Sequence, residues 1–331
     1  MENQSPVAID VHAVQRRASI MGHGLIIQAL IEGLSMRARF VLPPVVASVL
    51  LLTGCVDNSM PEMTGAAERV AAVTVNADAA ALLPKAVADS GVLAIGTAPN
   101  YAPNEFKDSE GESIGWDLEL ARGVARALGL EAVVAESNFD NIIPSVRGGK
   151  FDLGASSFTA TAEREQQLDF VHYYDAGAQW AAPVDSIVDP DDACGLKVAV
   201  QATTFQDTSE VPARSAACVA AGKPAIVKMP FDTQGNAVNA VVLGQADAFS
   251  ADSPVALYAL SKLEGRLQPA GEAFDVAPYG FVVAKDSGMA EAVQLALQGM
   301  VDDGSYGAIL DTWGVRAGGL ELITINPASQ G

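Results

Sequence analysis

The chain has few basic residues and few histidines, and these shortages exclude several classes of function. Only 20 lysines and arginines stand against 40 acidic side chains, which gives a net charge of −20 at pH 7. Such an acidic chain repels nucleic-acid phosphates and anionic lipid headgroups, so we expect neither as a partner. The three histidines lie at positions 12, 23 and 172, away from the cysteines. We therefore expect no metal site, and no other cofactor motif is present.

Cysteine is equally scarce, and its placement indicates an oxidising compartment. Of the three cysteines, Cys55 belongs to an N-terminal motif, which leaves Cys194 and Cys218 as a pair. We expect these two to form a disulfide, closing a loop of about 25 residues and contributing roughly 3.5 kcal/mol in the chain-entropy model. A metal site is the alternative, but it would need more ligands than this neighbourhood offers.

Long apolar runs are missing as well. The strongest one, residues 40–52, follows the basic pair Arg37 and Arg39 and is interrupted by Pro43 and Pro44. A membrane-spanning helix needs about 20 apolar residues, so this run is too short to cross a bilayer comfortably. A basic region followed by a short apolar core is instead typical of a secretory signal peptide.

The four residues that close this run indicate a lipid anchor. Leu52-Thr53-Gly54-Cys55 resembles a bacterial lipobox, in which the cysteine is lipidated and becomes the first residue of the mature protein. Residues 1–54 are then an N-terminal extension plus a lipoprotein signal peptide, with translation starting at Met1 or Met36. We expect an exported protein, lipid-anchored to the outer face of the cytoplasmic membrane. An uncleaved anchor, or a chance cysteine after an apolar run, is the alternative.

The remaining chain has the length and composition of a two-lobed α/β protein. Removing residues 1–54 from the 331 leaves 277, and 50% of the whole chain is hydrophobic, enough for two lobes with packed cores. Residues 55–90 are interpreted as a tether containing a short helix near 79–87. Beyond them, strands and helices alternate, which predicts a parallel sheet with helices on both faces. The predicted strands are 92–96, 131–135, 151–155, 197–200, 225–228, 247–250 and 279–284; the predicted helices are 117–128, 140–146, 209–221, 236–243, 289–301 and 306–312.

The alternation occurs twice and the chain returns late, so we expect two lobes joined by more than one crossing strand. Residues 179–183 and 277–284 are the predicted crossings. Lobe 1 then comprises residues 91–183 and 278–315, and lobe 2 comprises residues 184–277. Residues 316–331 are expected to form a C-terminal tail.

An ordered set of motifs over residues 91–315 resembles the family 3 extracellular solute-binding proteins, the amino-acid receptors of ABC importers. The matching segments are GTAPNYAPNEF (96–106), GWDLELA (115–121), FDNIIP (139–144), KFD (150–152), SSFTATAER (156–164), LDF (168–170), VAVQATT (198–204), GQADA (244–248) and DGSY (303–306). The set is more specific than any single motif. The resemblance implies a two-lobed periplasmic-binding-protein-like fold of type II, hinged on two crossing strands. It also implies a monomeric receptor, not an enzyme, that delivers an amino acid or close derivative to an ABC permease.

The resemblance assigns the ligand's carboxylate to Arg164. In the family the matching arginine binds the α-carboxylate, assisted by main-chain N–H groups at the positions of Thr159 and, in the other lobe, Thr204. A guanidinium can hold a carboxylate through two parallel hydrogen bonds, and a helix N-terminus adds further donors. A surface ion pair of Arg164 with Glu163 or Asp169 is the alternative.

The same resemblance places the ligand's ammonium near Asp252. This residue follows the predicted strand 247–250, whose carboxyl end would face the cleft, although its side chain could instead cap the following helix. Ser156 and Ser157 match a pair whose carbonyl or hydroxyl meets the ammonium. Two aromatic residues, Tyr101 and Phe139, match family rings that stack around the ligand, with packing in the core as the alternative. Trp116 is predicted to lie in the core. Trp180 is predicted to lie either in the core or at the pocket.

Two departures from the family pattern bear on specificity. Ala98 occupies a position where receptors for basic amino acids and glutamine carry an aspartate, and Asn104 stands where they carry phenylalanine. These differences argue against a receptor for arginine, lysine, histidine or glutamine.

Two other classes of function share the fold. A dehydratase would need a general acid in the cleft, and a sensor would need an output domain or a second membrane span, and we find neither signature in the sequence.

Overall fold

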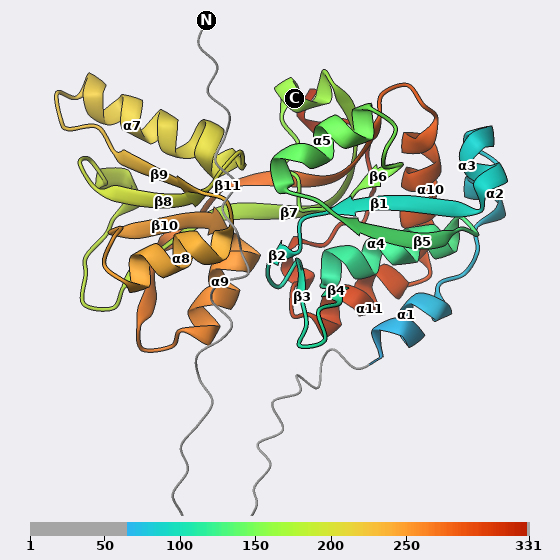
Figure 1. Cartoon of the computed structure of the whole chain (residues 1–331), viewed down its shortest axis with the longest axis horizontal. Coiled ribbons are helices and arrows are strands. Elements are labelled where there is room, and N and C mark those ends of the chain that lie inside the picture. The colour runs from blue at the N-terminus through green and yellow to red at the C-terminus, as the bar shows by residue number, and fades with distance from the viewer. Residues whose placement is uncertain (1–64, 330–331) are drawn as a thin grey trace, which may run out of the picture. The chain divides into compact units, whose positions relative to one another are not determined.

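One eight-stranded sheet runs through both lobes of the protein, in the order β5-β1-β6-β11-β7-β10-β8-β9 (Figure 1). The computed structural model describes residues 65–329, so the predicted signal peptide and Cys55 lie outside the described residues. Within the described part, no helix has the length and apolar character needed to cross a membrane. The strands are β1 (Val92–Thr97), β5 (Glu131–Glu136), β6 (Leu153–Gly154), β7 (Leu168–Pro183), β8 (Lys197–Gln201), β9 (Val227–Phe231), β10 (Ala248–Asp252) and β11 (Leu267–Ala284).

The two long strands β7 and β11 connect the lobes and form the hinge. They pair antiparallel along their length, from Leu267 opposite Pro183 to Ala284 opposite Leu168. In lobe 1 β11 pairs with β6, and in lobe 2 β7 pairs with β10, both antiparallel. The type II fold with two crossing strands is therefore confirmed, but the sheet is mixed rather than parallel because both crossing strands run against their neighbours.

Helices cover both faces of the sheet in each lobe (Figure 1). In lobe 1, α4, α10 and α11 share one apolar core and α5 belongs to another. In lobe 2, α8 and α9 share a core on one side, and α7 packs into a core on the other. These helices are α4 (Trp116–Ala127), α5 (Phe139–Arg147), α7 (Val211–Ala220), α8 (Gln234–Val242), α9 (Ser253–Lys262), α10 (Met289–Asp302) and α11 (Ser305–Thr312).

The N-terminal end of the described chain is folded onto lobe 1, so the expected tether is wrong for residues 66–90. This segment forms α1 (Ala66–Ala72), α2 (Ala77–Ala80) and α3 (Lys85–Ser90). Alanine-rich helices carry little apolar periodicity, yet Val73, Ala79 and Val87 are buried in the lobe 1 core. Arg69 Nε of α1 also donates to Glu119 Oε1 of α4 at 2.5 Å, which fixes α1 on the lobe.

The expected C-terminal tail is also folded. Ile325 forms an antiparallel bridge with Val171 of β7, and the N–H of His172 donates to the carbonyl of Thr324 at 2.8 Å. Ile323 is buried in the lobe 1 core. In lobe 1 this segment covers the edge of β7 that faces away from β11, which satisfies main-chain groups that the strand would otherwise expose.

Each lobe contains one smaller feature beside the main sheet. β2 (Asn100–Tyr101), β3 (Glu105–Lys107) and β4 (Ser113–Ile114) form a separate three-stranded sheet in lobe 1. In lobe 2, Cys194 and Cys218 form the predicted disulfide, with Cα atoms 5.5 Å apart. Because Cys218 lies in α7, the disulfide ties this helix to the segment that precedes β8.

Candidate ligand-binding site

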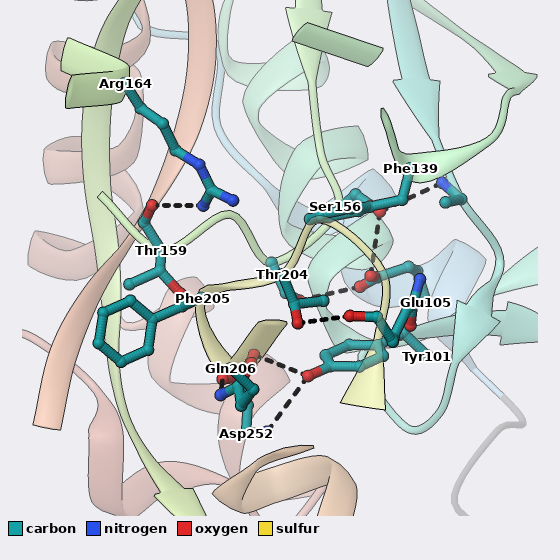
Figure 2. Close-up of a pocket in the computed structure, with 13 residues that line it drawn as sticks. Tyr101, Glu105, Phe139, Ser156, Thr159, Arg164, Thr204, Phe205, Gln206 and Asp252 are labelled. Atoms are coloured by element: carbon teal, nitrogen blue, oxygen red, sulfur yellow. Dashed lines mark hydrogen bonds between the residues drawn. The ribbon is translucent and has the colours of Figure 1, made fainter. Parts of the chain in front are cut away.

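Residues of both lobes line one small cavity (Figure 2). All eight side chains that we predicted to bind ligand line it: Tyr101, Phe139, Ser156, Ser157, Thr159, Arg164, Thr204 and Asp252. Ala98 lines it too, together with four residues to which the sequence assigned no role: Glu105, Gln201, Phe205 and Gln206. The motifs therefore locate one pocket, although its lining is wider than they indicated.

Arg164 supplies the positive charge of the pocket. It lies in the short helix α6 (Ala162–Glu165), whose N-cap, Thr161, accepts a hydrogen bond from the N–H of Arg164 at 3.2 Å. Nη1 donates to the carbonyl of Thr159 at 2.8 Å (Figure 2), and Nη2 donates to the carbonyl of Thr203, in lobe 2, at 2.9 Å. Burial lowers the pKa of Arg164. A guanidinium has five N–H donors, so three are left for a ligand.

The alternative surface ion pair is not the arrangement observed. Asp169 pairs with Lys285 instead, with its Oδ1 3.0 Å from Lys285 Nζ. Arg164 lines the cavity and its guanidinium joins main-chain carbonyls from the two lobes. The side chain is thus fixed at the wall of the pocket by both lobes.

Main-chain donors flank Arg164 on both lobes. Thr159 forms an isolated bridge with Tyr279, whose two bonds use the N–H groups of Ala160 and Gly280, so the bridge does not occupy the N–H of Thr159. Thr204 precedes η3 (Gln206–Glu210), a π-helical turn that continues into α7. The N-terminal end of this helical segment therefore lines the pocket, where its partial positive charge favours an anion.

Asp252 supplies a negative charge from lobe 2. It is the N-cap residue of α9, yet its side chain makes no capping bond, so the alternative capping role is excluded. Its carboxylate accepts hydrogen bonds from Gln206 Nε2 at 2.7 Å and from the hydroxyl of Tyr101 at 2.9 Å (Figure 2). Burial raises the pKa of Asp252, while its hydrogen-bond partners and the charge of Arg164 oppose this rise.

Tyr101 connects the two lobes. Its ring is buried among apolar residues of lobe 2, including Ala199 and Val238, although β2 belongs to lobe 1. The hydroxyl donates to Asp252 and also accepts the N–H of Asp252 at 3.2 Å. Phe139 is half-buried and stacks on Phe158 with ring centroids 4.7 Å apart. Both aromatic rings line the pocket, but Tyr101 also holds lobe 1 to lobe 2.

The largest addition to the predicted site is Glu105, a fully buried carboxyl. The hydroxyl of Ser156 donates to Oε1 at 3.1 Å, and that of Ser157 donates to Oε2 at 2.9 Å. The two serines predicted to meet an ammonium thus hold a carboxyl instead through their hydroxyls. Ser157 has the unusual φ of 53°, which marks a locally strained backbone at the pocket. Nothing in the sequence pattern signals this, because a charged residue at a turn usually lies in solvent.

A second carboxyl lies behind Glu105. Asp117, in the first turn of α4, accepts the N–H of Ser157 at 3.0 Å through Oδ2 and is fully buried, but it does not line the pocket. Burial raises the pKa of Asp117 to about 6. Burial, reinforced by the neighbouring charge of Asp117, raises the pKa of Glu105 well above its ordinary value.

Asn104, which departs from the family pattern, is held in place by hydrogen bonds to its neighbours. Trp116, buried in the core as predicted, donates from Nε1 to Asn104 Oδ1 at 2.8 Å, and Asn104 Nδ2 donates to Ser157 at 2.9 Å. Gly115 makes this approach possible, because a Cβ there would lie 2.0 Å from the carbonyl oxygen of Asn104.

Trp180 lies in the core and does not line the pocket. It is fully buried, and its Nε1 donates to Glu210 Oε1 at 3.2 Å.

The pocket combines charged groups of both signs, and the described residues that line it include no histidine. Within residues 65–329 no group of three or more His, Cys, Asp or Glu side chains could hold a metal ion. The one histidine in this range, His172, pairs with Asp175 and does not line the pocket. A cation and an anion facing one small cavity from different lobes suit a small zwitterion.

Comparisons with known proteins agree with this geometry. The family model of the bacterial extracellular solute-binding proteins, family 3, matches residues 93–316. The arginine-binding protein ArgT of Corynebacterium glutamicum is 40% identical over 85% of this chain and 93% of its own length. Among solved structures, an ancestral arginine-binding protein bound to arginine has a TM-score of 0.62 and 32% identity, covering 67% of this chain and 98% of its own. The ancestral amino acid-binding protein AncCDT-1, a precursor of cyclohexadienyl dehydratase, has a TM-score of 0.60 and 32% identity, covering 69% and 97%.

Proposed function

Because the chain belongs to the bacterial extracellular solute-binding proteins, family 3, we propose that its interlobe pocket binds an amino acid by both ends. Arg164 binds the α-carboxylate, together with the N–H groups of Thr159 and Thr204. Asp252 binds the α-ammonium from the opposite lobe. The observation that carries this assignment is the pair of opposite charges, Arg164 and Asp252, facing one small cavity from different lobes.

Binding by both ends explains how the ligand favours closure. A zwitterion that touches Arg164 on lobe 1 and Asp252 on lobe 2 makes all its contacts only when the lobes meet, so it stabilises the closed state. An ABC permease can then distinguish the liganded receptor from the empty one by the arrangement of the two lobes.

We propose that the receptor acts as a monomer, which size-exclusion chromatography with light scattering would test.

Calorimetric titration tests the assignment. The names of the relatives make L-arginine the first amino acid to titrate into the purified protein, followed by a panel of other amino acids. We expect a one-to-one complex with at least one amino acid, and Asp252→Asn should weaken it while leaving the ligand-free melting temperature nearly unchanged. Binding of no amino acid, or unchanged affinity in Asp252→Asn, would contradict the proposal.

Lipidation of Cys55 is the proposed mode of membrane attachment. The lipobox-like motif Leu52-Thr53-Gly54-Cys55 supports it, and the net charge of −20 leaves no basic surface excess to hold the protein on anionic lipid. Cys55→Ala should release the protein from the membrane fraction without changing its melting temperature. A Cys55→Ala protein that stays with membranes after a salt wash would exclude the anchor.

An enzyme of the same fold is the second possibility, raised by the likeness to AncCDT-1, a precursor of a dehydratase. We propose that this chain is not such an enzyme. The relative ArgT, which is 40% identical over 85% of this chain, is named as a binding protein. Incubation with prephenate should give no product above the uncatalysed rate, and turnover would overthrow this assignment.

A further inference from the structure

The pocket has one more carboxyl than a simple zwitterion can pair. Arg164 and the two carboxyls Asp252 and Glu105 line it. An amino acid with a neutral side chain pairs its carboxylate with Arg164 and its ammonium with Asp252. Glu105 is then left beside the ligand's side chain without a partner of opposite charge, and it stays protonated because an unpaired buried carboxylate is costly.

We propose that Glu105 binds a cationic group on the ligand's side chain, so that the receptor selects basic amino acids. The inference rests on the proposed function, because it takes the α-carboxylate and α-ammonium to occupy Arg164 and Asp252. With a basic ligand the pocket holds two cations and one anion from the ligand against two anions and one cation from the protein.

The surroundings of Glu105 support this role. Its two oxygens accept hydroxyl groups, one from Ser156 and one from Ser157. The ion pairs formed within residues 65–329 include neither Glu105 nor Asp117. Two carboxyls are thus buried together with no protein cation bound to either, beside a cavity that opens toward Glu105.

Ionisation of this pair is consistent with the same role. Burial and the charge of Asp117 raise the pKa of Glu105, so the pair retains a proton where isolated carboxyls would lose theirs. A ligand cation beside Glu105 favours its ionised form and displaces that proton. Glu105 therefore exchanges a proton for the side-chain cation and remains neutralised in both states.

Glu105 also accounts for the alanine at position 98. Ala98 suggested that the pocket lacks the carboxylate that reads a basic side chain. In the structure the N–H of Ala98 donates to Ser156 Oγ at 3.2 Å, and Ser156 in turn donates to Glu105. A carboxyl from β3 therefore lies two hydrogen bonds away from the main chain of Ala98, and both residues line the pocket.

The test compares L-arginine with L-citrulline, which replaces the charged guanidinium by a neutral ureido group of nearly the same shape. Titration calorimetry should show arginine binding at least roughly 30-fold more tightly, as expected for a buried charge pair. Glu105→Gln should weaken arginine binding by a similar factor and leave citrulline nearly unchanged, so that the preference collapses. Glu110→Gln changes an exposed glutamate in the turn between β3 and β4; it is the matched control and should keep the full preference.

The outcomes separate this inference from the proposed function. Arg164→Ala should weaken both ligands alike, whereas a role for Glu105 in folding alone would lower the melting temperature without changing the ratio of the two affinities. If citrulline binds the native protein as tightly as arginine, or if Glu105→Gln keeps the preference, Glu105 does not read a cation and only this inference fails. If neither these ligands nor any other amino acid binds, the proposed function fails as well.

Discussion

At the scale of single residues, Arg164 carries the sharpest consequence of the proposed site. Arg164→Ala removes the group that neutralises a ligand carboxylate inside a closed pocket, and losing one partner of a buried charge pair costs about 2–5 kcal/mol. The affinity for the ligand should fall by roughly 30-fold to several thousand-fold in calorimetric titration. Retention of the native affinity would remove Arg164 from the site.

Lysine should not rescue this position. The guanidinium already donates to the carbonyls of Thr159 and Thr203 through its two terminal nitrogens, and it keeps further donors for the ligand. A lysine ammonium is a point charge with three donors and cannot reproduce this planar arrangement. Arg164→Lys should therefore bind nearly as weakly as Arg164→Ala, which distinguishes geometric recognition from simple charge attraction.

Burial of Glu105 also predicts how stability depends on pH. Folding raises its pKa above the usual 4.5, so above that pH the native protein holds a proton that the unfolded chain has lost. Stability therefore falls as pH rises through this window. Glu105→Gln avoids the loss, so its stability relative to the native protein should increase as pH rises above 4.5 in denaturant titrations. The ionisable groups acting on or with Glu105 are Asp117, Tyr101 and Tyr173.

The control for this prediction is Glu110→Gln, because Glu110 is exposed. Its stability relative to the native protein should stay constant over the same pH range. A flat response of Glu105→Gln would mean that Glu105 ionises in the native protein as readily as in the unfolded chain.

The residues that could be predicted from sequence are those marked by a local motif. Arg164 belongs to the motif SSFTATAER, Asp252 ends the strand that begins at the end of GQADA, and both line the pocket. Glu105 and Gln206 could not be found in this way, because their roles depend on partners far away in the chain. Gln206 bonds Asp252 across 46 positions, and Glu105 bonds Ser157 across 52.

At the scale of elements, the disulfide between Cys194 and Cys218 predicts a measurable part of the stability of lobe 2. It closes a loop with a sequence separation of 24, and a loop of this size contributes about 3.5 kcal/mol when the crosslink restricts the unfolded chain. Reduction, or the double substitution Cys194→Ser with Cys218→Ser, should lower the melting temperature by about 5–10 °C. Two thiols that can be alkylated in the unreduced native protein would show that the bond is absent.

The elements that sequence predicted well are those with a long one-sided apolar pattern. The helix predicted at 117–128 is α4 (Trp116–Ala127), and that at 289–301 is α10 (Met289–Asp302). The short strands β2, β3 and β4 were missed because two or three residues carry no periodicity. Most of β11 was missed for another reason: Gly271, Glu272 and Asp275 interrupt any alternation in the part that crosses into lobe 2.

At the scale of the whole molecule, the two lobes meet through a few direct hydrogen bonds around the pocket. Arg164 of lobe 1 donates to the carbonyl of Thr203 in lobe 2 at 2.9 Å. Gln201 of lobe 2 donates to Asn100 Oδ1 in lobe 1 at 3.3 Å. Together with the bonds between Tyr101 and Asp252, these contacts couple the groups that would bind the ligand to the groups that join the lobes.

Tyr101 is the point at which this coupling can be tested. Its hydroxyl makes two bonds with Asp252 across the lobes, at 2.9 and 3.2 Å, and separated lobes cannot form them. Tyr101→Phe keeps the ring in its apolar surroundings and removes both bonds. Because a hydrogen bond to a charged group contributes about 1.5–3 kcal/mol, affinity for the ligand should fall roughly tenfold or more.

The loss should be the same for every ligand, because Tyr101 acts on closure and not on the ligand's side chain. The preference for arginine over citrulline should therefore survive in Tyr101→Phe, in contrast to Glu105→Gln. Tyr258→Phe is the matched control: Tyr258 of lobe 2 faces Phe106 of lobe 1 with ring centroids 6.1 Å apart, but it does not line the pocket. This variant also loses one hydroxyl and should bind like the native protein. Equal losses in the two tyrosine variants would mean that closure depends on the general contact between the lobes rather than on the bonds between Tyr101 and Asp252.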